Sequence, residues 1–261
     1  RRYAVTFVEN HDTEYRSAGA PQDPIRKDTL AANAFLLAMP GTPCVFFKHW
    51  QAYKQEIKAM IEARKAAGIT NTSNYTNFIS SAQLYANNID EKLLVAVGAT
   101  ETITPNENLW TKVLSGHHYA YYLAKNMETA WADKGSGDFT EAFDVTLTSV
   151  SANSESKLVY TTDGTAPSAS NGKQVASGTS IKIDATTTLK VGLLVGSTVS
   201  GVITRTFTYV EPEVQPKAEC VFNEGEICAF FEAPDSWTHT VHCWAWTDSP
   251  SDNFTGGGWP G

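Results

Sequence analysis

The chain has 261 residues, a formal net charge of −8 at pH 7 and no block of basic residues. This length is enough for about two domains, and the negative charge argues against nucleic acid and anionic membrane surfaces as partners. No apolar run is long enough to span a membrane, so we expect no membrane insertion. The seven tryptophans and ten tyrosines suit a protein that stacks sugars, although most of them are expected to be core residues.

An apolar run at the start of the chain, residues 3–8, predicts a strand buried on both faces, as in a parallel sheet. Asn10, His11 and Asp12 follow it directly. In a parallel α/β barrel, catalytic residues lie where strands end and loops begin. The run therefore brings an amide, an imidazole and a carboxylate to the edge of the sheet where such folds hold their active sites.

Two helices and a second strand are expected before Gly68. A helical face of apolar residues follows Asp28, which we expect to cap it, and Pro40-Gly41 ends it. Residues 42–47 predict a second buried strand in which Cys44 is a buried thiol, and a second helix ends at Gly68. Successive β-α units imply a parallel sheet with right-handed crossovers. Two units cannot close a sheet, so we expect its other strands upstream, in a longer protein from which this chain is a piece.

The rest of the chain is predicted to be mainly β structure. Residues 69–127 predict a small antiparallel sheet, and the polar, glycine-containing stretch 126–138 predicts a linker. Short alternating strands over 139–210 predict a β-sandwich, and 211–216 predicts a second, stiffer linker. The last segment, 217–261, is again β-like and carries four of the seven tryptophans.

The cysteines leave the cellular compartment open. Cys220, Cys228 and Cys243 lie close together in the sequence, but their spacing fits no standard zinc pattern. Cys220 and Cys228 could face each other across a hairpin, so a disulfide and two free thiols are both compatible with the sequence.

Four segments near the start resemble a known family. They are Phe7–Thr13, Pro40–His49, Glu56-Ile57 and Ile61–Lys65. Their order and spacing resemble the last conserved stretches of the α-amylase family of glycoside hydrolases, in a version similar to plant-type enzymes. The resemblance covers about half of the chain. It implies that residues 1–68 are the last two β-α units of a (β/α)8 barrel and that residues 69–127 are the antiparallel β domain that follows it.

The resemblance implies roles for two residues. Asp12 matches the family's third catalytic carboxylate, a transition-state stabiliser that grips sugar hydroxyls beside the reacting carbon, and His11 matches the residue that hydrogen-bonds the same sugar. Positive charge builds on the sugar ring in the transition state, so a fixed carboxylate stabilises that state more than the ground state. The alternatives are that Asn10 and Asp12 form a turn and that His11 is structural. His49 either lines the pocket, as a substrate-binding residue, or bonds a loop.

The carboxyl groups that break the bond are expected elsewhere. Retaining glycosidases need a nucleophile and an acid/base roughly 5 Å apart, and in this family both come from earlier barrel strands. The calcium ligands of an α-amylase are also upstream, so the resemblance implies calcium for the parent enzyme but no metal ligand in this chain. We therefore expect the parent protein to be a hydrolase and this chain alone to be inactive.

Two further resemblances concern the second half of the chain. Val159–Ser168 is similar to the signature of an immunoglobulin-like module found at the ends of chitobiases and β-hexosaminidases, which implies a spacer sandwich over 139–210. The segment 217–261 resembles part of a starch-binding module, in which aromatic rings stack on α-glucan. If the aromatic face of this segment is not core, its candidate ligand contacts are Trp237, His242, Trp244 and Trp246.

These observations predict a multidomain fold, α/β plus all-β: the C-terminal part of a (β/α)8 barrel, an antiparallel β domain, an immunoglobulin-like β-sandwich and a partial carbohydrate-binding module. The leading functional hypothesis is the C-terminal part of a secreted α-amylase, extracellular or at the cell surface and monomeric, that acts on starch and malto-oligosaccharides. One alternative is a non-catalytic starch-binding surface protein with a degenerate barrel. Another is a neopullulanase or malto-oligosaccharide-forming relative, and loops outside this chain decide between these specificities.

Overall fold

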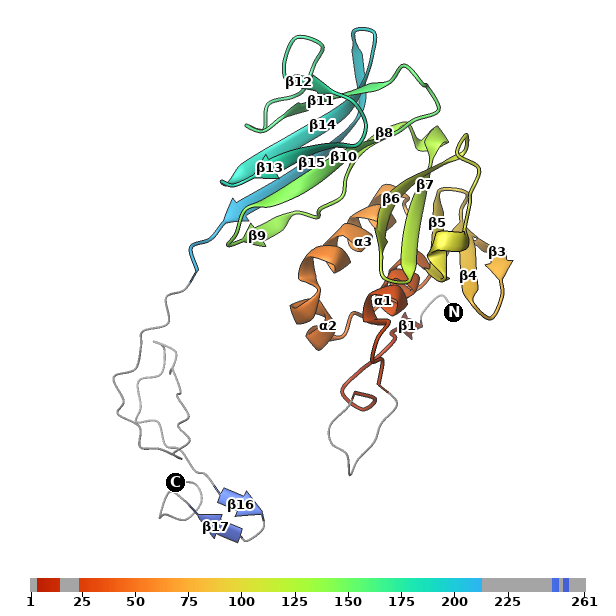
Figure 1. Cartoon of the computed structure of the whole chain (residues 1–261), viewed down its shortest axis with the longest axis vertical. Helices are drawn as coiled ribbons and strands as arrows, with labels where there is room; N and C mark the ends of the chain where they lie inside the picture. The colour runs from red at the N-terminus through yellow and green to blue at the C-terminus, as the bar shows by residue number, and fades with distance from the viewer. Residues whose placement is uncertain (1–3, 15–23, 213–245, 249–250, 254–261) are drawn as a thin grey trace. The chain divides into compact units, whose positions relative to one another are not determined.

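The computed structural model describes residues 4–14, 24–212, 246–248 and 251–253. The chain divides into two units, Arg1–Pro212 and Glu213–Gly261. In the first unit, a region that carries the helices is followed by a region of β-strands (Figure 1). In the second unit, β16 (Trp246–Asp248) and β17 (Ser251–Asn253) form an antiparallel pair.

The first elements of the chain form a β-α-β unit. β1 (Val5–Thr6) pairs in parallel with β2 (Thr42–Pro43), and α1 (Thr29–Ala38) lies between them in the sequence. α2 (Phe47–Ala52) and α3 (Lys54–Ala66) follow. Helices at the positions of α1 and α3 and a parallel pairing were predicted, and the structure confirms them. No helix in the described ranges is both long enough and apolar enough to cross a membrane.

The residues that flank α1 set its ends. Asp28 precedes the helix and its backbone oxygen accepts the N–H of Ala32, but its side chain makes no capping hydrogen bond. The helix stops before Pro40-Gly41. Gly41 has a φ of +146°, and a Cβ atom there would lie 3.0 Å from the side chain of Thr6. Glycine is needed at this position because other residues rarely adopt this backbone and would crowd the strand.

Arg64 of α3 satisfies carbonyl groups at the C-terminal end of α1. Its guanidinium donates to the backbone oxygens of Leu37 and Met39, both at 2.7 Å, and to that of Gly41 at 2.8 Å. The last carbonyls of a helix have no partner inside the helix, and the rigid fork of donors on arginine suits several converging acceptors. Arg64 therefore joins α3, the end of α1 and the turn that enters β2.

The two buried strands expected at the start are wrong in burial and in extent. Val5 is 61% exposed and Phe7 is 54% exposed, because within the described residues β1 pairs on one side only, with β2. The second strand ends at Pro43. Phe47 begins α2 instead, since the sequence of this helix contains no glycine, proline or β-branched residue to oppose it. Cys44, expected as a buried thiol, is exposed.

A five-stranded antiparallel sheet follows the helices, and this pairing agrees with the prediction. In pairing order its strands are β3 (Tyr75–Ser80), β4 (Leu84–Ile89), β5 (Leu93–Gly98), β7 (Tyr119–Ala124) and β6 (Trp110–Gly116). α1 and α3 cover one face of this sheet (Figure 1), and Met60 and Leu93 are fully buried between them. Tyr121 of β7 is also fully buried there, and its hydroxyl donates to the backbone oxygen of Ala34 in α1.

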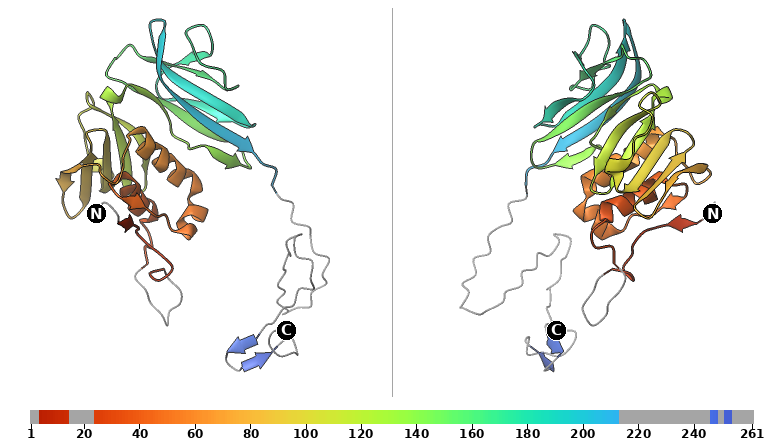
Figure 2. Two further views of the ribbon diagram at one scale, coloured as in Figure 1. Left: turned by 180° about the vertical axis from the view of Figure 1, so that it is seen from behind. Right: turned by 45° about the vertical axis from the view of Figure 1, so that its right-hand side comes forward.

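Two further sheets share one hydrophobic core, and Figure 2 shows them from behind and in an oblique view. The first sheet consists of β13 (Thr179–Ile183), β10 (Phe143–Val150) and β8 (Thr129–Ala132). The second consists of β12 (Lys173–Val175), β11 (Lys157–Thr161), β14 (Thr187–Val195), β15 (Thr198–Tyr209) and β9 (Gly137–Phe139). Short 3-10 helices occur at Thr100–Thr102 and Lys125–Met127. Two sheets around one core are compatible with the predicted sandwich, whose immunoglobulin-like topology stays a prediction.

The linker predicted at residues 126–138 is wrong, because β8 lies within it. Successive residues of β8 face different cores: Ala130 and Ala132 belong to the core of the two sheets, whereas the fully buried Trp131 belongs to the core of the helical region. The Trp131 indole Nε1 donates to the backbone oxygen of Val113 at 3.2 Å. A strand of four residues is too short to show its alternation inside a polar, glycine-containing stretch.

Arg205 of β15 lies where these two regions of the first unit meet. Its guanidinium carbon is 5.3 Å from the centroid of the Trp131 ring, and its Nη1 is 3.2 Å from Oε2 of Glu62 on α3. Its Nε donates to the backbone oxygen of Lys134 at 3.3 Å. Burial lowers the pKa of Arg205, and the Glu62 carboxylate opposes that effect. The ion pair therefore joins a helix of the first region to a strand of the second.

Candidate functional site

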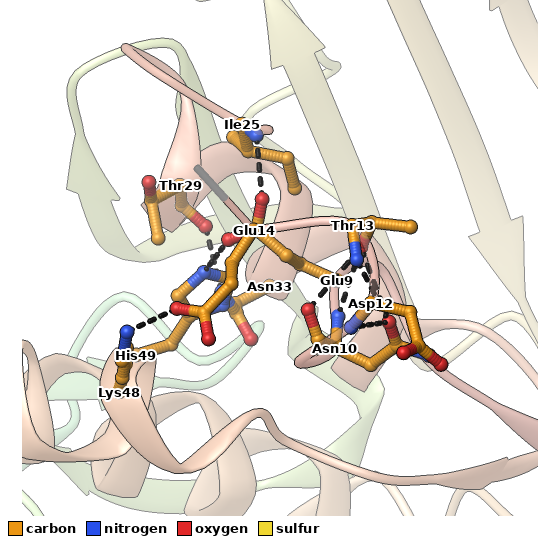
Figure 3. Close-up of polar contacts among 10 residues, drawn as sticks. All are labelled: Glu9, Asn10, Asp12, Thr13, Glu14, Ile25, Thr29, Asn33, Lys48 and His49. Carbon is orange, nitrogen blue, oxygen red and sulfur yellow. Dashed lines mark hydrogen bonds and ion pairs between the residues drawn. The ribbon is translucent and has the colours of Figure 1, made fainter. Parts of the chain in front are cut away.

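Asn10 organises the turn at the carboxyl end of β1. Its Oδ1 accepts the backbone N–H of Asp12 at 2.9 Å and that of Thr13 at 3.2 Å, and its backbone oxygen accepts the N–H of Glu14 at 3.1 Å (Figure 3). Asparagine favours turns because its side chain can bond backbone groups a short distance along the chain. The turn-forming interpretation is therefore correct for Asn10.

His11 and Asp12 lie on the surface of this turn. Their side chains are 77% and 70% exposed, and His11 Nε2 is 3.5 Å from Asp12 Oδ1. The turn thus presents an imidazole and a carboxylate to solvent together, at the carboxyl end of a strand that has a parallel neighbour. Both residues are predicted to hydrogen-bond a sugar. That role requires exposed side chains, because a buried carboxylate could not reach sugar hydroxyls.

Three buried polar side chains connect the end of β1 to two helices. Glu9 Oε2 is 2.7 Å from Nε2 of His49 in α2, and His49 Nδ1 is 3.0 Å from Nδ2 of Asn33 in α1. All three residues are buried. Figure 3 shows this chain of contacts and the turn that follows Glu9 in the sequence. Glu9 is therefore held directly by His49, 40 positions further along the chain, and Asn33 holds His49 in turn.

The contacts also define which nitrogen of His49 carries a proton. Asn33 Nδ2 donates to the backbone oxygen of Thr29 at 2.8 Å, and because an amide nitrogen only donates, His49 Nδ1 is an acceptor. His49 Nε2 then donates to Glu9. The second oxygen of Glu9 accepts the backbone N–H of Ile25 at 2.7 Å, so both oxygens of this buried carboxylate have donors, as burial of a charge requires.

Of the two interpretations left open for His49, the geometry favours bonding over lining a pocket. Its side chain is buried and both ring nitrogens have partners. Glu9 and Asn33 were not predicted as part of this arrangement. Asn33 could have been found, because it is a polar residue on the apolar face of a predicted helix, whereas nothing in the sequence around Glu9 indicates a partner 40 residues away.

Glu14, the other carboxylate described close to the turn, forms an ion pair with Lys48 at the start of α2. With Glu9 bonded to His49 and to Ile25, both of the glutamates that flank the turn are engaged in contacts within the protein. The turn therefore offers Asp12 to solvent while its neighbouring carboxylates hold the turn and the strand against the helices.

Sequence comparisons point to the same family that the motifs resemble. The chain is 31% identical to the probable α-amylase 2 of Arabidopsis thaliana over 123 residues, which is 46% of this chain and 29% of that protein. It is 37% identical to the α-amylase type B isozyme of Hordeum vulgare over 100 residues, 36% of this chain and 62% of that protein. No protein-family model matches the chain.

A third relative has a different name. The chain is 41% identical to the glucan 1,4-α-maltotetraohydrolase of Stutzerimonas stutzeri over 76 residues, 26% of this chain and 14% of that protein. The chain spans less than two thirds of the length of each of these curated relatives. Their names support the resemblance to α-amylases for the part of the chain that they match.

The candidate sugar contacts near the end of the chain are in the second unit. Trp237, His242 and Trp244 lie outside the described residues, as do Cys220, Cys228 and Cys243. Trp246 begins β16, for which the backbone pairing alone is described. The predicted starch contact of these four aromatic residues stays a prediction.

One cluster of metal-ligating side chains in the described ranges can be compared with the ligands that calcium prefers. Within the described ranges, one group of three metal-ligating side chains lies close together: Asp28, His117 and His118. Calcium prefers six to eight oxygen ligands, and two of these three side chains offer nitrogen. The donor set of this cluster therefore does not fit calcium.

Proposed function

We propose that this chain forms the C-terminal part of an α-amylase-like glycoside hydrolase that cleaves α-1,4-glucosidic bonds of starch with retention of configuration. The observation that carries the proposal is the exposed His11–Asp12 pair at the carboxyl end of β1, in a chain similar to proteins named α-amylase. The exposed apolar residues of β1 support it, because further strands of a barrel would cover them.

In this proposal Asp12 stabilises the transition state. As the glycosidic bond breaks, positive charge develops on the sugar ring, and a fixed carboxylate that bonds the neighbouring hydroxyls stabilises this charge more than it stabilises the bound substrate. His11 bonds the same sugar. The buried contacts of Glu9 with His49 hold the strand end in place before substrate binds, so no free energy is needed to order it during the reaction.

The nucleophile and the acid/base come from a different part of the protein. A retaining mechanism needs two further carboxyl groups about 5 Å apart on either side of the scissile bond. Glu9 and Glu14 flank the turn, but one is bonded to His49 and the other is paired with Lys48. We therefore expect no starch hydrolysis by this chain alone, and full activity only where the strands with those carboxyl groups are present.

Substitution of Asp12 in the complete parent enzyme tests the proposal. Asp12→Asn keeps the size of the side chain and removes its charge, so kcat should fall by about 100-fold or more while KM changes little. Glu14→Gln is the matched control, since it neutralises a carboxylate of the same turn but keeps an oxygen that accepts from Lys48. The Lys48 side chain is 63% exposed, so the charge of this pair adds little, and kcat should stay near that of the parent. An Asp12→Asn enzyme with parental kcat would exclude the role given to Asp12.

One observation favours an alternative product specificity. Two relatives are named glucan 1,4-α-maltotetraohydrolase, and one of them is 31% identical over 147 residues, 53% of this chain. The alternative is therefore an enzyme of the same chemistry that releases malto-oligosaccharides of one length. Chromatography of the products from amylose separates the two, because an endo-acting α-amylase gives a range of lengths early in the reaction and the alternative gives one dominant product.

We further propose that residues 217–261 belong to a starch-binding module and that residues 139–210 serve as a spacer. The two sheets around one core are compatible with a spacer sandwich, and the aromatic residues of the tail suit sugar stacking. A monomeric state stays a prediction. An extracellular location also stays a prediction, and one relative is named as chloroplastic.

A further inference from the structure

Three side chains from two distant segments of the chain meet on the surface of the first unit. Asp28 precedes α1, and His117 and His118 form the turn between β6 and β7. Asp28 Oδ1 is 2.6 Å from His118 Nδ1 and 3.7 Å from His117 Nε2, and one ligand atom from each of the three side chains lies within 4.8 Å of the others. These three residues are called the Asp28 cluster below.

The backbone places these groups together in an unusual way. An aspartate directly before a helix normally bonds the first free N–H groups of that helix, but the side chain of Asp28 makes no such bond and turns to the two imidazoles instead. His118 has a φ of +59°, a conformation that few residues other than glycine adopt. This turn stacks the two rings, whose centroids are 3.7 Å apart. The turn therefore brings both imidazoles beside the Asp28 carboxylate.

We propose that the Asp28 cluster binds Zn²⁺. Imidazole nitrogen and carboxylate oxygen are both normal ligands of this ion, which takes them at about 2.0–2.2 Å in a tetrahedral arrangement. In such a site the ligand atoms are about 3.3 Å apart. The observed separations of 2.6 and 3.7 Å bracket that value. All three side chains are exposed, so the stacked rings have room to separate and direct their nitrogens at one ion. Water completes the fourth position.

A bound ion would connect two parts of the fold that are distant in the sequence. Asp28 and His118 are 90 residues apart, one at the start of α1 and the other in a hairpin of the five-stranded sheet. The ion would replace the hydrogen bond between them by coordination to both. The site is independent of the proposed glucan hydrolysis, because none of its ligands belongs to the turn that holds His11 and Asp12.

The test is a metal titration of the whole chain after removal of metal. Zn²⁺ alone is titrated by calorimetry, and Co²⁺ is used in a parallel experiment because its visible spectrum reports the ligand type. Asp28→Asn and His118→Asn each remove one ligand, and asparagine at position 118 accepts a positive φ. His11→Gln is the matched control: His11 is also an exposed histidine near an aspartate, at 3.5 Å, but it lies outside the cluster.

The unsubstituted chain and His11→Gln should each bind one more equivalent of Zn²⁺ than Asp28→Asn and His118→Asn bind. All four proteins should have the same far-ultraviolet circular dichroism spectrum, which shows that the substitutions leave the fold intact. The Co²⁺ bands lost in those two variants should lack thiolate charge-transfer features, which distinguishes the cluster from the cysteines near the chain end. The proposal would be overturned if the unsubstituted chain and both cluster variants bound Zn²⁺ with the same stoichiometry and affinity. Co²⁺ bands that are all thiolate bands and are unchanged by both substitutions would overturn it too.

Discussion

The ion pair between Glu62 and Arg205 offers the sharpest test of how the first unit is stabilised. Arg205 is almost fully buried, and its Nη1 is 3.2 Å from Glu62 Oε2. At an effective dielectric constant of about 20, the charges attract each other by about 5 kcal/mol. Glu62→Gln removes this attraction but keeps a neutral acceptor in the same place. The guanidinium is then left buried without a counter-ion, while its bond to the Lys134 carbonyl is unchanged.

The net loss of stability should be smaller than the gross attraction. Breaking a fully buried pair costs about 3–5 kcal/mol, and exposed pairs contribute about 0–1 kcal/mol. The Glu62 side chain is 24% exposed, so hydration already offsets part of the attraction. We expect Glu62→Gln to lower the free energy of unfolding by about 2 kcal/mol, and Glu62→Leu combined with Arg205→Met to stay within about 1 kcal/mol of the parent, because no unpaired charge is then buried.

Urea unfolding at neutral pH, followed by tryptophan fluorescence, measures these differences. Lys65→Gln is the matched control, because it removes the other ion pair of the same glutamate, whose Lys65 partner is 69% exposed, and it should cost less than about 0.5 kcal/mol. The reasoning is refuted if Glu62→Gln and Lys65→Gln destabilise the chain equally. It is also refuted if the double substitution costs more than Glu62→Gln alone.

Three further predictions rest on other contacts. Burial raises the pKa of Tyr121 well above 10.0, so above about pH 10 the unfolded chain loses this proton first and stability falls by up to about 1.4 kcal/mol per pH unit. Tyr121→Phe should lessen that fall in unfolding measured from pH 9 to 11, and an unchanged slope would contradict the assignment. Arg64→Lys should cost about 2 kcal/mol and lower the melting temperature, because one ammonium cannot serve three carbonyls; an unchanged melting temperature would show that these bonds add little. In native gels that contain amylose, the chain should be retarded and Trp244→Ala should migrate faster, whereas equal migration would remove Trp244 from the sugar site.

The sequence predicted those elements that are formed by residues only a few positions apart. The apolar spacing that follows Asp28, and the Pro40-Gly41 stop, were enough for α1, because a helix is formed by contacts within one segment. The Asn10-His11-Asp12 order likewise indicated polar residues at the end of β1, and a turn was one of the two interpretations left open for them. These features depend on neighbours within a few positions, which a single sequence displays.

Features that depend on distant partners were missed or misjudged. Burial of β1 was predicted from its composition, yet Val5 is exposed because its burial depends on layers that other strands supply. Glu9 was left out of the site, although His49, 40 residues away, makes it a buried and bonded carboxylate. Trp131 was assigned to a linker, since the core that accepts it is formed by helices and strands much earlier in the chain.

The indole of Trp131 has a consequence for how these regions can be exchanged between proteins. A β domain that follows another domain can be moved into a new protein most easily when the residues between them are flexible. Here the junction delivers a large aromatic ring into the interior of the preceding region, with its N–H bonded to Val113. If residues from 128 onward were joined to another protein, that protein would need a pocket of matching shape for the Trp131 ring. If the chain were instead cut before residue 129, the region that remains would lose this ring and keep a void in its core.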